Sequence, residues 1–126
     1  MDMNKKFLVT TSSIILLLMT NLVKAGQADI LDAKALPSGD GWRFTVSIEH
    51  ADTGWDHYAD AWRVVTEEGD LLGERTLMHP HEGEQPFTRS LDGVKIPKNI
   101  NVVYIEAHDS VHGWSSQRVK INLRGH

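Results

Sequence analysis

The chain contains no cysteine in 126 residues, and beyond its first 25 residues it has no segment with the 3.6-residue period of a helix. Without cysteine, a disulfide framework is excluded, so the folded part must be stabilised by packing alone. We also expect no lipid anchor at an export cleavage site, because that attachment requires a cysteine. What the sequence does contain is an apolar leader, a series of alternating segments and a concentration of histidine.

The first 25 residues, MDMNKKFLVTTSSIILLLMTNLVKA, have the features of a secretory signal peptide. A basic head precedes an apolar run from Phe7 to Met19, and small residues (Val23 and Ala25) occupy the third-last and last positions before the expected cut. The run is shorter than the roughly 20 residues that a membrane span needs. We therefore expect a mature periplasmic or secreted domain, residues 26–126, with an uncleaved anchor as the alternative.

Basic residues are scarce in the predicted mature domain. The whole chain has 17 acidic and 13 basic residues, and removing Asp2 and three lysines with the leader leaves 16 and 10, a formal net charge of −6. Because no basic run is available to neutralise phosphates, we expect neither nucleic acid nor a membrane surface as a partner after cleavage. About 100 residues are enough for one domain with a single core.

Alternation of apolar and polar residues predicts strands along the whole mature chain. It is clearest in residues 42–49, where Trp42, Phe44, Val46 and Ile48 alternate with polar side chains, the pattern of a strand buried on one face. The predicted strands are 27–36, 42–49, 58–66, 71–78, 87–91, 102–108 and 117–123. Seven short strands in a domain of this size predict an all-β, seven-stranded antiparallel two-sheet sandwich.

Two resemblances support this prediction. The segment VVYIEAHDSVHGWSSQRVKINL resembles the last hairpin of immunoglobulin-like and fibronectin type III-like domains, and Trp62 lies early on the third strand as in that architecture, although the cysteine pair of antibody domains is missing. The strings HADTGWDHYADAWRVV, HPHEGEQPFTRSL and DSVHGW resemble those of a group of small exported proteobacterial proteins of uncharacterised function. The resemblance covers essentially the whole mature chain and implies a fold and an exported location, but no chemistry.

Six of the seven histidines fall in alternate connections of the predicted sandwich. Successive antiparallel strands run in opposite directions, so alternate connections share one end of the molecule. The three connections 50–57, 79–86 and 108–116 contain His50, His57, His79, His81, His108 and His112. The sequence therefore predicts a histidine-rich pole.

This pole is a candidate site for a transition metal. Residues i and i+2 of an extended segment point the same way, so His79 and His81 are predicted to bind one ion together, and Pro80 stiffens the segment between them. Imidazole nitrogens suit Zn²⁺ or Cu²⁺. We expect these two side chains to point toward His108 or His112, with His50 or His57 nearby. Acidic neighbours that would ligate or orient the imidazoles are Asp56, Glu82, Glu84 and Asp109. The alternative is that the histidines are solvated or cap turns.

No catalytic motif is present, since the sequence lacks G-x-S-x-G, a glycine-rich phosphate loop and the D-x-D-x-D-G calcium pattern. The leading prediction is an exported, non-catalytic binding domain whose partner is a metal ion or another exported protein. The alternative is an adhesion or carbohydrate/protein-docking module that uses Trp55, Tyr58 and Trp114, with the histidines incidental. These aromatic residues would otherwise plug the open end of the sandwich, which we favour for Trp114.

One buried ion pair is predicted from strand phase. Asp60 shares the inward phase of Trp62, and Arg89 shares that of Phe87 and Leu91. A buried carboxylate and guanidinium must be paired to be tolerated, so Asp60 and Arg89 are expected to meet. The alternative is a bulge that turns one of the two side chains out.

Overall fold

The structure, a computed structural model, describes residues 26–124, and all of their regular structure is β. The predicted signal peptide, residues 1–25, lies outside the described residues. The strands are β1 (Asp29–Ser38), β2 (Gly41–Glu49), β3 (Ala59–Val65), β4 (Leu71–Thr76), β5 (Phe87–Val94), β6 (Val102–Asp109), β7 (Gly113–Trp114) and β8 (Val119–Asn122). Within residues 26–124 there is no helix with the length and apolar character that crossing a membrane requires.

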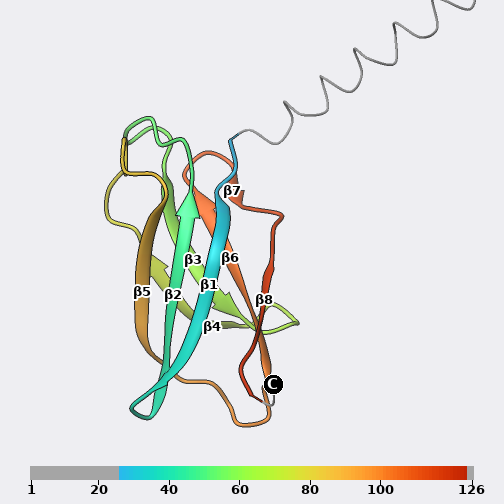
Figure 1. Cartoon of the computed structure of the whole chain (residues 1–126). Helices are drawn as coiled ribbons and strands as arrows, with labels where there is room; N and C mark the ends of the chain where they lie inside the picture. Colours follow the sequence, from blue (N-terminus) through green and yellow to red (C-terminus); the bar gives the residue numbers. More distant parts are fainter. Residues whose placement is uncertain (1–25, 125–126) are drawn as a thin grey trace, which may run out of the picture.

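The eight strands form two antiparallel sheets packed as a β-sandwich (Figure 1). One sheet has the order β1-β2-β5, and the other has the order β4-β3-β6-β7, with β8 also paired to β6. The predicted all-β class and the two antiparallel sheets are therefore confirmed. The count differs because the predicted connection 108–116 contains an additional two-residue strand, β7, while the predicted seventh strand, 117–123, corresponds to β8.

The core lies between the sheets and is built from the inward members of the alternating segments. In β2, Phe44, Val46 and Ile48 are at most 1% exposed, whereas their polar neighbours face outward. Trp62 of β3 is fully buried opposite them, among the side chains of the second sheet. Period-two alternation thus correctly identified the buried face of β2.

The segment between β7 and β8 is hydrogen-bonded to the start of β1. The Ser115 hydroxyl donates to the Ala28 carbonyl (2.7 Å), and the Gln117 amide both accepts from the Ile30 N–H (2.8 Å) and donates to the Ile30 carbonyl (3.1 Å). Gln117 therefore provides the donor and acceptor that a neighbouring strand would provide. This clamp fixes the position of the chain just after Gly26.

Three loops meet at one end of the sandwich, where β1 also begins (Figure 1). They are residues 50–58, 77–86 and 110–112, which contain five of the six histidines of the predicted pole, while His108 lies at the end of β6. The Tyr58 N–H donates to the Ser110 hydroxyl, and the His50 N–H donates to the Gln85 side chain, so the loops contact one another directly. We call this end the histidine pole.

Candidate functional site

Asp109, the last residue of β6, is the centre of the histidine pole. Its side chain is 0% exposed. One carboxylate oxygen, Oδ1, accepts hydrogen bonds from the N–H groups of Val111 (2.9 Å) and His112 (2.7 Å), a local turn that aspartate commonly forms. The other oxygen, Oδ2, is buried and has no hydrogen-bond partner within residues 26–124. A buried carboxylate oxygen in this condition requires an explanation.

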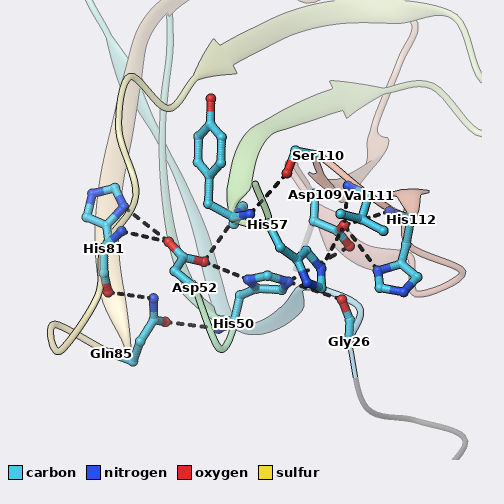
Figure 2. Close-up of polar contacts among 12 residues, drawn as sticks. Gly26, His50, Asp52, His57, His81, Gln85, Asp109, Ser110, Val111 and His112 are labelled. Carbon is cyan, nitrogen blue, oxygen red and sulfur yellow. Dashed lines mark hydrogen bonds and ion pairs between the residues drawn. The ribbon is translucent and has the colours of Figure 1, made fainter. Parts of the chain in front are cut away.

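Three imidazoles surround this carboxylate (Figure 2). His57 Nε2 lies 3.3 Å from Oδ1 of Asp109, and His112 Nδ1 lies 3.2 Å from the same oxygen. His50 Nε2 lies 4.0 Å from Oδ2. The His57 ring is 4.7 Å from the His50 ring and 4.9 Å from the His112 ring, measured between centroids. Three nitrogen-bearing rings and one carboxylate therefore share a small volume.

The geometry matches the dimensions of a metal centre. One ligand atom from each of His50, His57 and Asp109 can be chosen so that all lie within 4.8 Å of one another. Ligands at about 2.0–2.1 Å from a tetrahedral Zn²⁺ ion are separated by about 3.3 Å, so the side chains would have to move closer together to hold an ion. His57 Nε2, like Asp109 Oδ2, is buried without a hydrogen-bond partner in the described chain, so neither atom is engaged by another protein group.

Asp109 is ionised at neutral pH. Burial by itself raises the pKa of its carboxyl group, but hydrogen bonds from the N–H groups of His112 and Val111, together with the His112 side chain, outweigh burial and hold the pKa below its ordinary value. The site therefore contains a buried negative charge that can act as a ligand.

Asp52 organises the other side of the pole. Its side chain is 0% exposed, and Oδ1 accepts from His50 Nδ1 (2.6 Å) and from the Ala59 N–H (3.1 Å). Oδ2 accepts from the His81 N–H (2.7 Å). Because Nδ1 of His50 donates to Asp52, Nε2 is the nitrogen that faces Asp109, as in metal sites where a carboxylate orients a ligating imidazole.

The predicted HPH motif does not form the centre of this cluster. His79 and His81 do lie together, with ring centroids 4.6 Å apart, but His79 is exposed and its Nδ1 lies 3.0 Å from the Pro80 carbonyl. His81 is buried, stacks on Phe87 at 3.9 Å and accepts a hydrogen bond at Nε2 from Arg89 (2.9 Å). Since a guanidinium can only donate, this nitrogen's lone pair is already engaged. His81 therefore supports the fold, and the tight cluster forms without it.

Burial holds the pKa of His81 below its ordinary value, and the positive charge of Arg89 and the neighbouring His79 add to the shift. The ring is consequently neutral at pH 7. Its proton resides on Nδ1, which points toward Asp52 Oδ2 at 4.0 Å.

Asp60 and Arg89 were predicted to form a buried ion pair, but they do not pair with each other among the residues that the structure describes. Asp60 instead contacts His108 Nδ1, and Arg89 donates to His81 and to the Thr88 carbonyl. The pairing of β3 with β6 shifts register between Ala59 and Ala61, so a bulge at Asp60 turns the carboxylate away from the core. His108, predicted as a pole ligand, contacts Asp60 and packs against Trp114, with ring centroids 4.8 Å apart. Because adjacent residues of β6 point to opposite faces, it lies on the other side of the strand from Asp109.

The pole aromatic residues have different environments. Trp114 does not plug the sandwich: the Arg63 guanidinium lies 3.6 Å above its ring, outside the core. Trp55 is 67% exposed and meets Tyr58 edge to face, with ring centroids 5.5 Å apart.

The sequence identifies neither Asp52 nor Gly26 as a residue of the site. The Gly26 carbonyl oxygen lies 3.1 Å from His50 Nε2, and together these residues border an open hollow of about 410 Å³. Each acts through a contact between segments distant in sequence, for which a single sequence gives no signal.

Comparisons with known proteins give one relative. A protein of Halomicrobium mukohataei described as "Putative lipoprotein" is similar to this chain, with 36% identity over 97 residues that cover 76% of this chain and 47% of the relative. The chain thus spans about half the length of that relative. No protein-family model matches the chain, and no solved structure matches it.

Proposed function

We propose that this protein is an exported, non-catalytic domain that binds one Zn²⁺ or Cu²⁺ ion at its histidine pole. The ligands would be His50, His57 and Asp109, with His112 as a further imidazole at the edge of the site. The observation that carries the proposal is the buried Asp109 carboxylate, whose Oδ1 lies beside His57 and His112 and whose unpartnered Oδ2 lies 4.0 Å from His50 Nε2. Burying a charge without compensation is costly, and a cation between these groups compensates it directly.

The donor chemistry supports the same ions. Neutral imidazole nitrogens and a carboxylate are ligands that Zn²⁺ and Cu²⁺ accept readily, whereas Ca²⁺ and Mg²⁺ prefer sites built from oxygen. Asp52 would hold His50 in the tautomer that directs Nε2 to the ion. The hollow beside Gly26 and His50 gives the ion a path from solvent.

Calorimetric titration of tag-free, metal-free mature protein with ZnCl₂ and CuCl₂ tests the proposal. We expect binding with one-to-one stoichiometry and a submicromolar Kd. Asp109→Asn retains an oxygen for the Val111 and His112 N–H groups but removes the negative ligand, so it should weaken binding by at least about tenfold, since removing even an outer partner of a ligand costs about 10–100-fold. His79→Ala, which removes an exposed imidazole outside the cluster, is the matched control and should bind as wild type.

A weak, multi-site isotherm that is the same for wild type, Asp109→Asn and His79→Ala would refute the proposal. In that case the cluster is a set of imidazole–carboxylate contacts that stabilises the pole. Thermal unfolding in the presence of each ion gives an independent measure, because a ligand that binds only the native state raises the Tm.

We propose an exported, periplasmic or secreted location and an immunoglobulin-like or fibronectin type III-like arrangement of the sandwich, as in the resembling proteobacterial group. The leader sequence and the lipoprotein description of the relative support export. The strand order supports the arrangement, because the fifth strand returns to pair with the second and the sixth with the third.

A second candidate function is docking to a carbohydrate or protein through the pole aromatics. It is favoured by the exposed Trp55–Tyr58 pair and by Val111, which is 58% exposed on a neighbouring loop. A glycan array probed with wild type and Trp55→Ala tests it: binding that is lost in Trp55→Ala but kept in Asp109→Asn favours docking over metal binding.

A further inference from the structure

Gly26, the residue expected to become the N-terminus after export, lies inside the histidine pole. Its carbonyl oxygen is 3.1 Å from His50 Nε2. Its Cα packs so closely on His112 that a Cβ added at this position would lie 2.8 Å from Cε1 and 3.1 Å from Nε2 of that ring. Gly26 is therefore held between two of the imidazoles that surround Asp109 (Figure 2).

This position is determined by the fold. Two residues later, Ala28 is fully buried and bonded to Ser115, and Ile30 is held by Gln117. A side chain at position 26 would displace His112, so glycine is the residue that allows the backbone to approach the imidazoles.

We propose that the α-amino group created by cleavage between Ala25 and Gly26 is itself a ligand of the metal ion, so that the complete site forms only in the processed chain. This inference rests on the metal-binding function proposed above and on the predicted cleavage position. The amine nitrogen and the carbonyl oxygen of one glycine would close a five-membered chelate ring with the ion, while His50 and His57 provide imidazole nitrogens and Asp109 provides the charge.

The chemistry depends on removal of the leader. In the precursor the Gly26 nitrogen belongs to a peptide bond, whose lone pair is delocalised, so it can bind a metal only after losing the N–H proton. In the processed chain it is an α-amino group, which releases its proton to solvent more readily and forms a nitrogen–metal bond. A set of nitrogen and oxygen donors of this kind suits the tetragonal geometry of Cu²⁺.

Three forms of the protein distinguish the amine from the rest of the site. The first begins with a free Gly26, the second carries an acetyl group on the Gly26 nitrogen, and the third retains Ala25 as an extra N-terminal residue. Each is titrated with CuCl₂ by calorimetry. Acetylation removes the amine lone pair with little added bulk, and the Ala25 form keeps a free amine but moves it one residue away. Circular dichroism of the metal-free forms checks that all three fold.

We expect the free Gly26 form to bind Cu²⁺ at least about tenfold more tightly than both other forms, because each of them loses a direct ligand and loss of an outer partner alone costs about 10–100-fold. Equal submicromolar, one-to-one binding by all three forms would overturn this inference and leave the proposed function intact, since the imidazoles and Asp109 would then suffice. Absence of specific binding by all three forms would overturn both. Electron paramagnetic resonance of the Cu²⁺ complex gives a second readout, because substituting ¹⁵N-glycine should change the nitrogen hyperfine pattern only if the Gly26 amine is bound.

Discussion

Replacing Asp52 by alanine should destabilise the protein more than any other single change at an acidic residue of the three pole loops. The Asp52 side chain is 0% exposed and accepts three hydrogen bonds, from His50 Nδ1, the Ala59 N–H and the His81 N–H. These donors belong to the start of the 50–58 loop, the first residue of β3 and the 77–86 loop. Alanine would leave all three without their acceptor and would remove the carboxylate that links these three segments.

The size of the effect follows from the number of bonds. Hydrogen bonds to a charged group contribute about 1.5–3 kcal/mol each, so three bonds at the lower end of that range give a loss of about 4–5 kcal/mol. In a domain of about 100 residues a loss of 1 kcal/mol lowers the Tm by about 4–8 °C, so Asp52→Ala should lower it by roughly 16–40 °C. Asp52→Asn retains one acceptor oxygen and should fall between alanine and wild type.

Urea unfolding at pH 7.5, followed by circular dichroism, measures the free energy of unfolding of these variants. Asp56→Asn is the matched control, because Asp56 is an exposed carboxylate in the same loop and should change the stability by no more than about 0.5 kcal/mol. If Asp52→Ala unfolds within 1 kcal/mol of wild type, the three hydrogen bonds do not hold the pole together and the reasoning is wrong.

The remaining predictions concern His81, the absent ion pair and the leader. Folding lowers the pKa of His81, so below about pH 6.5 the unfolded chain binds more protons than the native protein. The free energy of unfolding should therefore fall as the pH drops from 7.5 to 5.5. His81→Gln should reduce this pH dependence in urea unfolding experiments. Asp60→Asn and Arg89→Met should destabilise additively, with a coupling under about 0.5 kcal/mol in a double-mutant cycle, because they share no partner; a coupling of about 3–5 kcal/mol would instead indicate a direct buried pair. N-terminal sequencing of exported protein should begin at Gly26, and an intact Met1 terminus in the membrane fraction would contradict the predicted cleavage.

The all-β class and the gathering of loops at one end could be predicted because they depend on local regularities. Alternation in Phe44, Val46 and Ile48 identifies a strand and its buried face, since side chains of a strand point to opposite sides in turn. Antiparallel neighbours then bring alternate connections to the same end. Neither step requires knowledge of which atoms meet, so a single sequence was enough for both.

The residues that form the cluster could not be predicted in the same way, because they come from distant parts of the chain. Gly26 and His50 are 24 positions apart, and His50 and Asp109 are 59 positions apart. A bulge at Asp60 directs its carboxylate to His108. Arg89 donates to the lone pair of His81, so the HPH motif, the most conspicuous in the sequence, stabilises the fold and is not the centre of the cluster. Asp109 instead lies beside His50 and His57, and the Gly26 carbonyl contacts His50. By itself the sequence determined which side chains would be available at the pole. Only the tertiary structure decided which of them share a centre, because a shift of one residue in strand register changes the side from which each imidazole and carboxylate approaches its neighbours.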